Sequence, residues 1–242
     1  MIEELEGIVI SETDYGETSK ILNILTKKYG IIGVISKGCK KLKSDLRSVS
    51  DKMTYGVFNV FYKENKLSTL ISVDVINNFK NIKKDIERIS YANYLIELSG
   101  QVAKQHFGQS IYDYLISSLV KINDGFDSLV ITNIVELKYL DLLGVLPFLE
   151  GCVICHNKQS IITISSYKGG YLCNKCRQNE KLVSAKTIKL IRMFYYVDID
   201  KISKIDIDDK SKYEINQFLD EYYDRYTGLY LKSKDFIKLI KG

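Results

Sequence analysis

The chain is organised around Cys152-Val153-Ile154-Cys155 and Cys173-Asn174-Lys175-Cys176. The two Cys-x-x-Cys pairs are separated by 17 residues, numbers 156 to 172, and this spacing is typical of four-thiolate zinc sites. Zinc binds four thiolates in a tetrahedron, and each Cys-x-x-Cys turn directs two sulfur atoms towards one centre. Gly169-Gly170 favours a tight hairpin just before the second pair. We therefore predict that all four cysteines bind one structural Zn²⁺.

Three other uses of these cysteines are weaker. A redox Cys-x-x-Cys motif occurs singly and has no reason to be doubled, and disulfides are rare in the reducing cytoplasm. The site could also be empty, or His156 could replace Cys155 as a ligand. With four thiols available, His156 is more simply an exposed residue beside the metal. Four protein ligands leave no open coordination position, so we expect the metal to stabilise the fold without taking part in catalysis.

Composition indicates a cytoplasmic protein of two or three domains. The chain has 242 residues, of which 45% are hydrophobic, and a formal net charge of +5. Gly accounts for 15 residues and Pro for 1, so long Pro-rich linkers are excluded and the domains should abut. The acidic N-terminus has no signal-peptide pattern, and no apolar run reaches transmembrane length. The odd fifth thiol, Cys39, is expected to be a small buried residue.

The first eighty residues predict a small barrel. Short runs rich in β-branched and aromatic residues are separated by turn residues, with no helical pattern between them. Five such strands in about eighty residues are typical of an OB-fold. The predicted strands are 5–10, 20–26, 31–36, 54–62 and 67–76.

Positive charge is concentrated between the third and fourth predicted strands. Residues 37–47 contain five basic residues and one acid, whereas the rest of residues 1–80 contains seven lysines and nine acids. In an OB-fold such a loop borders the face that binds single-stranded nucleic acid. The alternative is a solvated surface that keeps the protein soluble. Tyr15, Tyr29 and Tyr55 are possible stacking partners, although barrel packing is their simpler role. The predicted DNA-binding residues are Lys37, Lys40, Lys41, Lys43 and Arg47.

Helical periodicity dominates the rest of the chain. Apolar positions at helical spacing run from Ile82 to about Gln105, from 111 to 122 and from 128 to 144, and they resume after residue 184. The fold class is thus α+β: an N-terminal OB-fold barrel followed by an α-helical domain with an inserted four-cysteine zinc module. The expected boundaries are 1–80 for the DNA-binding barrel, 81–147 with 181–242 for the helical domain, and 148–180 for the zinc module.

No catalytic arrangement is recognisable. The two histidines, His106 and His156, are not placed in a nucleophile–base pattern. Phosphate-binding glycine motifs are absent, and the acids are scattered rather than clustered as a metal-dependent nuclease requires. We therefore expect a protein that is not an enzyme.

Several motifs, in order, resemble the bacterial DNA repair protein RecO family. The N-terminal ones are Asp14-Tyr15-Gly16-Glu17 with Lys20-Ile21-Leu22, then Lys37-Gly38, then Met53-Thr54-Tyr55-Gly56. The resemblance continues through residues 85–92 and 136–144 and reaches Gly169-Gly170 and Cys173, as in zinc-bearing members. It covers about residues 5 to 176, and its specificity comes from the order of the motifs.

The resemblance implies a recombination mediator for DNA repair. Such proteins bind single- and double-stranded DNA, anneal complementary strands and work with the partner protein RecR. They help to place RecA on strands coated by single-strand-binding protein, whose tail they recognise in the helical domain. A cytoplasmic, nucleoid-associated protein is expected.

Two other function classes stay open on the residues alone. In the first, a zinc-ribbon nucleic-acid binder, the metal module itself contacts nucleic acid. Residues 156–180 support it, because they carry Lys158, Lys168, Lys175 and Arg177 against the single acid Glu180. The second is a protein-interaction adaptor without annealing activity.

Overall fold

The structure is a computed structural model that describes residues 1–106 and 108–241. It consists of two compact units, Met1–Asn123 and Asp124–Gly242. The first unit contains the strands of a barrel and three helices, and the second contains four helices of at least ten residues and a two-stranded hairpin.

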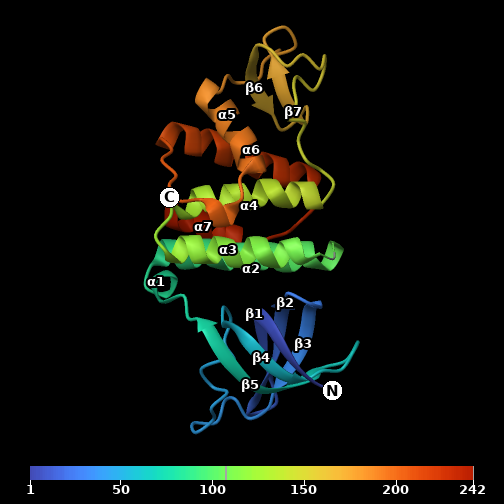
Figure 1. The fold of residues 1–242 in the computed structure, drawn as a ribbon. Helices are drawn as coiled ribbons and strands as arrows, with labels where there is room; N and C mark the ends of the chain where they lie inside the picture. Colours follow the sequence, from blue (N-terminus) through green and yellow to red (C-terminus); the bar gives the residue numbers. More distant parts are fainter. Residues whose placement is uncertain (107, 242) are drawn as a thin grey trace. The chain divides into compact units, whose positions relative to one another are not determined.

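Five strands of the first unit form a closed barrel (Figure 1). β1 pairs antiparallel with both β2 and β4, and β3 pairs parallel with β5, which gives the closed order β1-β2-β3-β5-β4. A five-stranded barrel of this kind is the OB-fold architecture. The strands are β1 (Ile2–Tyr15), β2 (Ser19–Thr26), β3 (Gly30–Ser36), β4 (Tyr55–Phe61) and β5 (Ser68–Asn77).

Alternation along the strands builds the barrel core. Side chains at every second position point inwards, as Leu22 and Ile24 do on β2. Burial of each such side chain contributes about 1.5–3 kcal/mol to the free energy of folding. β1 is longer than its partners and shifts register between Val9 and Ser11, a bulge that bends the strand so that it can pair on both sides. The buried core consists of Leu5, Val9, Leu22, Ile24, Ile32, Val34, Phe58, Val60 and Leu70.

Three helices complete the first unit. They are α1 (Lys80–Lys83), α2 (Ile86–Gln105) and α3 (Gln109–Asn123). The helical spacing predicted one helix from Ile82, but the chain breaks before α2 because the Asp85 carboxylate accepts hydrogen bonds from the N–H groups of Glu87 and Arg88 and caps the new helix. α3 is linked to the barrel, since Tyr112 Oη donates to Glu6 Oε1 at 2.8 Å.

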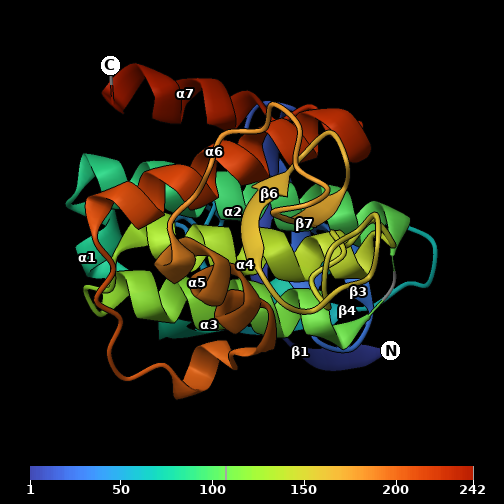
Figure 2. The ribbon, with the colours of Figure 1, turned by 90° about the horizontal axis from the view of Figure 1, so that it is seen from above.

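The second unit combines helices with a hairpin. α4 packs against α5 and α6, and the buried Tyr223 hydroxyl on α6 donates to the carbonyl oxygen of Glu136 at 2.8 Å. The hairpin β6–β7 packs against α5 and lies beside it in both ribbon views (Figures 1 and 2). It is hydrogen-bonded to α6, because Ser166 in its turn donates to Glu221. The elements are α4 (Ser128–Leu142), β6 (Ile161–Ser165), β7 (Gly170–Cys173), α5 (Ala185–Tyr196), a 3-10 turn (Ile199–Lys201), α6 (Asp209–Tyr226) and α7 (Lys232–Lys241).

The predicted fold class is confirmed: an OB-like barrel precedes a helical region, and a four-cysteine cluster lies in the segment between α4 and α5. The compact units divide at residue 123, so α1, α2 and α3 are grouped with the barrel. The functional boundaries at residues 80, 147 and 180 stay a prediction. Within the described residues, no helix has both the length and the apolar character needed to cross a bilayer.

Candidate metal centre and nucleic-acid surface

The four predicted cysteines come together in the second unit. Cys152 and Cys155 lie in a turn before β6, Cys173 ends β7, and Cys176 follows in the next turn. All four Sγ atoms lie within 4.8 Å of one another. The sequence spacing therefore brings together the side chains that it predicted.

The distances fit a tetrahedral metal ion. Zn–S bonds of about 2.3 Å give S···S edges of about 3.8 Å in a tetrahedron, and Cys155 Sγ and Cys173 Sγ are 3.7 Å apart. A disulfide would require about 2.05 Å, and the cysteines are free. His156 is not part of the cluster; it is exposed, and its ring lies edge-on to Phe148 with the centroids 5.4 Å apart.

Backbone hydrogen bonds favour the thiolate form of Cys152. Burial opposes ionisation of Cys152, but hydrogen bonds from the backbone around Cys155, Cys173 and Ile154 outweigh it and lower the pKa of this thiol to about 6. A backbone hydrogen bond closes each Cys-x-x-Cys turn: His156 N–H donates to the Cys152 carbonyl at 2.8 Å, and Arg177 N–H donates to the Cys173 carbonyl at 3.0 Å. Thiolate ligands that accept hydrogen bonds from surrounding groups are typical of structural zinc sites.

Two glycines position the second Cys-x-x-Cys turn, Cys173–Cys176. Gly169 has a φ of 81°, a conformation that L-residues rarely adopt, and it closes the turn between β6 and β7. Gly170 lies against Phe148, and a Cβ there would be 2.5 Å from the Phe148 carbonyl oxygen. Gly169 thus allows the turn, and Gly170 allows β7 to lie close to the backbone of Phe148.

The basic residues of the loop between β3 and β4 are exposed in the first unit. Lys37, Lys40, Lys41, Lys43 and Arg47 all have exposed side chains. Lys40 forms an ion pair with Asp14, with Nζ and Oδ2 2.7 Å apart. In the described part of the chain, the other four form no ion pair with a carboxylate. Their charges are therefore available to an anion from solvent.

The loop is fixed at the barrel while its cations face outwards. Cys39 is 2% exposed and Leu46 packs against the barrel core, so these residues anchor the loop on its inner side. Lys40 N–H donates to the Thr18 carbonyl at 2.9 Å. At the far end, Lys20 Nζ donates to Asp51 Oδ1 at 2.7 Å. The prediction that Cys39 is a buried filler residue is confirmed.

The three candidate stacking tyrosines have different surroundings. Tyr55 is 8% exposed and donates to Glu6 Oε1 at 2.8 Å. Tyr29 stacks on Tyr62, with ring centroids 4.6 Å apart, and donates to Glu3. Both therefore belong to barrel packing. Tyr15 is 53% exposed and is the one of the three whose ring is open to solvent.

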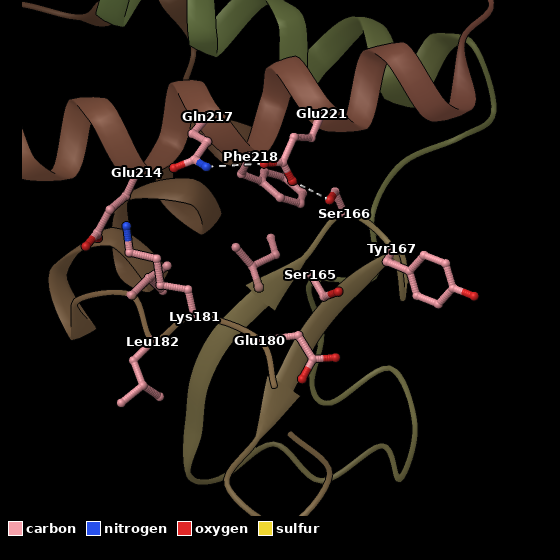
Figure 3. A pocket seen from close by; sticks show the side chains of 12 residues that line it. Ser165, Ser166, Tyr167, Glu180, Lys181, Leu182, Glu214, Gln217, Phe218 and Glu221 are labelled. Carbon is pink, nitrogen blue, oxygen red and sulfur yellow. Dashed lines mark hydrogen bonds between the residues drawn. The ribbon is translucent and has the colours of Figure 1, made fainter. Parts of the chain in front are cut away.

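Sequence reasoning missed a surface formed where the hairpin meets α6. A pocket of about 270 Å³ lies there, lined on one side by Ser165 and Ser166 and on the other by Phe218 and Glu221 (Figure 3). Tyr167 borders it at the hairpin turn. These residues are more than fifty positions apart along the chain, so no local pattern could bring them together; the only sequence signal was an exposed-type tyrosine beside Lys168.

Comparison with known proteins covers both units. The family described as "Recombination protein O N terminal" matches residues 1–79, and that described as "Recombination protein O C terminal" matches residues 83–235. The "DNA repair protein RecO" of Bacillus pumilus is 37% identical over 246 residues, which cover 100% of this chain and 96% of the relative. Proteins of the same name from Listeria monocytogenes serotype 4b and from Bacillus subtilis are each 35% identical over 241 residues, which cover 98% of this chain and 94% of the relative. Since these matches span the barrel, the helices and the cysteine cluster, the chain belongs to the family of the DNA repair protein RecO.

Proposed function

We propose that this protein is a non-enzymatic recombination mediator in DNA repair. It binds single- and double-stranded DNA, anneals complementary strands and helps to load a recombinase on strands coated by single-strand-binding protein. The observation that carries the proposal is a row of exposed, mostly unpaired cations on an OB-like barrel in a member of the RecO family.

The barrel loop supplies the proposed DNA contact. Lys37, Lys40, Lys41, Lys43 and Arg47 bind backbone phosphates, whose counterions are released on binding. Lysine contacts phosphate as a point charge and reads no base edge, so binding is independent of sequence. This suits a mediator that must act on any broken chromosome. Residues 1–80 thus bind DNA, while residues 81–147 and 181–242 form the helical domain and provide its protein contacts.

The proposed partners follow from the same family membership. RecR joins the protein on DNA, single-strand-binding protein is contacted through its acidic tail, and RecA is the recombinase that is finally loaded. The protein acts in the cytoplasm at the nucleoid.

The cysteine cluster is proposed to hold one structural Zn²⁺. Cys152, Cys155, Cys173 and Cys176 would complete its coordination, and the ion would supply folding stability to the module 148–180. The tetrahedral spacing of the sulfur atoms supports this assignment.

A strand-annealing assay tests the proposal. Two complementary oligonucleotides, one of them fluorescently labelled, are mixed with the purified protein, with and without single-strand-binding protein. We expect faster duplex formation in both conditions and loss of the acceleration when Lys40, Lys41 and Lys43 are replaced by Ala. Binding to DNA without any annealing would instead indicate a zinc-ribbon nucleic-acid binder, and failure to bind DNA at low salt would indicate a protein-interaction adaptor.

A further inference from the structure

The turn between β6 and β7 presents an aromatic ring to solvent. Tyr167 is 67% exposed. Its ring points away from the pocket formed by the other labelled residues in Figure 3. An exposed aromatic ring offers a flat apolar face on which a ligand can stack. Its surroundings indicate what that ligand is.

The turn is held rigidly on α6. Ser166 Oγ donates to Glu221 Oε2 at 2.8 Å, and Tyr226 Oη donates to the carbonyl oxygen of Tyr167 at 3.2 Å. Tyr226 is itself packed on Tyr222, with ring centroids 4.4 Å apart. The ring of Tyr167 is thus carried by a fixed backbone, and little conformational entropy is lost when a ligand stacks on it.

Two cations lie over the ring of Tyr167. The Arg225 guanidinium carbon lies 4.9 Å from the ring centroid, and Lys168 Nζ lies 5.5 Å from it. Within the described residues, neither cation forms an ion pair with a carboxylate, although the charge of Lys168 also acts on Glu180.

The acids of α6 near Arg225 have partners of their own. Asp220 and Asp224 both pair with Lys234, each at 3.2 Å. Glu221 accepts the hydrogen bond from Ser166, so among the described residues none of these three acids forms an ion pair with Arg225.

We propose that Tyr167, Arg225 and Lys168 form a second contact for single-stranded DNA, in the Asp124–Gly242 unit. A base stacks on the exposed ring of Tyr167, and the adjoining phosphates are bound by the two cations. An aromatic face with cations beside it is the chemistry with which proteins hold unpaired nucleotides. This inference rests on the DNA-binding function proposed above and adds to it a contact that reads the unpaired state of the base.

Charge also determines on which side of the turn the bound strand runs. The pocket on the other side of the turn is lined by Glu180, Glu214 and Glu221, which repel phosphate, and by Lys181. The strand therefore leaves Tyr167 on the side away from this pocket. Bases of intact duplex are stacked on each other and do not reach the ring, so duplex DNA gains nothing from Tyr167.

Three substitutions test the contact. Tyr167→Ala removes the ring, Tyr167→Phe keeps it, and Tyr213→Ala removes a control tyrosine that is 61% exposed on α6. Binding is measured to a single-stranded oligonucleotide, to a strand of the same length with abasic sites, and to duplex. Unfolding temperature and zinc content confirm that each variant is folded.

The expected result is specific to bases. Tyr167→Ala weakens single-strand binding about tenfold, because stacking on one aromatic side chain is worth about 1–3 kcal/mol. It leaves duplex and abasic-strand binding unchanged, and both control variants bind like the wild type. In addition, an oligonucleotide that contains 5-iodouracil should form a photochemical cross-link to Tyr167, located by mass spectrometry. Wild-type binding by Tyr167→Ala, or an equal loss on the abasic strand, would overturn the inference.

A barrel-loop variant separates the two proposals. If replacing Lys40, Lys41 and Lys43 by Ala weakens binding while Tyr167→Ala does not, the barrel contact stands and the second contact is wrong. If replacing the three lysines leaves DNA binding unchanged and the cross-link to Tyr167 still forms, the barrel contact is wrong and the second contact stands alone. If the wild type binds no single-stranded DNA, both proposals fail.

Discussion

Glu6 is the residue that joins the barrel to α3 within the first unit. Its Oε1 accepts hydrogen bonds from Tyr55 and from Tyr112, each at 2.8 Å. The hydrogen bond from Tyr55 is the largest influence on this carboxyl; although partial burial opposes it, the pKa of Glu6 is lowered, with help from Tyr112. Conversely, burial raises the pKa of Tyr112 far above its usual value, so Tyr112 stays a hydrogen-bond donor.

Replacing Glu6 with Gln should destabilise the first unit by about 1–3 kcal/mol at pH 7, because hydrogen bonds to a charged acceptor are replaced by weaker neutral ones. The pKa of Glu6 is depressed in the folded state, so its contribution is present above the unfolded pKa of about 4.3 and is lost as the pH falls through the folded pKa. Urea unfolding between pH 3 and pH 7 measures this. Glu4→Gln, on an exposed position of the same strand, is the control; equal pH profiles for the two variants would contradict the role of Glu6.

Cys173→Ser should abolish stoichiometric zinc binding, because one of four thiolates is removed from a closed tetrahedral site. We expect the second unit to lose about 3 kcal/mol or more, as is usual when a structural metal is removed. Zinc content by a chelating dye and thermal unfolding provide the measurements. Cys39→Ser, at a buried thiol outside the cluster, should keep one zinc per chain, and a Cys173→Ser protein with full zinc content would exclude the proposed ligand set.

At the scale of elements, the β3–β4 loop concentrates the proposed DNA contacts. Its cations are exposed, and among the residues that the structure describes only Lys40 has a carboxylate partner, Asp14, which is also on the surface. Such exposed ion pairs contribute about 0–1 kcal/mol. The charges of the loop can therefore be removed without unfolding the barrel.

Changing Lys40, Lys41 and Lys43 to Ala should weaken single-stranded DNA binding and leave the unfolding temperature nearly unchanged. The slope of log affinity against log salt should fall by about 0.7 for each phosphate that the protein no longer neutralises. Fluorescence anisotropy at several salt concentrations measures the slope. Replacing Lys63 and Lys66, in the turn between β4 and β5, gives a variant that also removes exposed positive charge; an unchanged slope in the first variant would exclude this loop from the DNA site.

The elements show what the sequence could and could not predict. Period-2 alternation, as at Leu22 and Ile24, identified the strands, and cysteine spacing identified the metal cluster, because both signals are local. The break before α2 was missed, because apolar spacing continues from Ile82 to Ile86. The separation of α1 from α2 is marked by the hydrogen bonds with which Asp85 caps α2. The cation over the ring of Tyr167 was also missed, because Arg225 reaches it only through the packing of the hairpin on α6.

At the scale of the whole molecule, the two compact units differ in what stabilises them. The first has a continuous barrel core, whereas the second includes a cysteine cluster whose buried neighbours are few: Cys152, Leu172 and Cys173 form its local core. A small core of this kind needs a metal ion for independent stability.

Removal of zinc by a chelator should therefore affect the units unequally. We expect amide hydrogen exchange to accelerate in residues 148–180, as local opening becomes easier, while amides of β1, β2 and β4 keep their protection. Mass spectrometry of peptides before and after chelation provides the comparison. Uniform acceleration across both units would show that the metal supports the whole chain.

Closure of the barrel has a consequence for how the protein is made. β1 emerges from the ribosome before β4, yet one of its edges pairs with β4, as in the alignment of Ile2 with Phe61. Nascent chains that end before β4 hold β1 with one edge unpaired, a surface that chaperones or neighbouring chains can bind. The second edge of β1 is paired only after β4 has been made, and the barrel closes only after β5, so a chain stalled within the β3–β4 loop would expose an unpaired strand edge that is prone to aggregate.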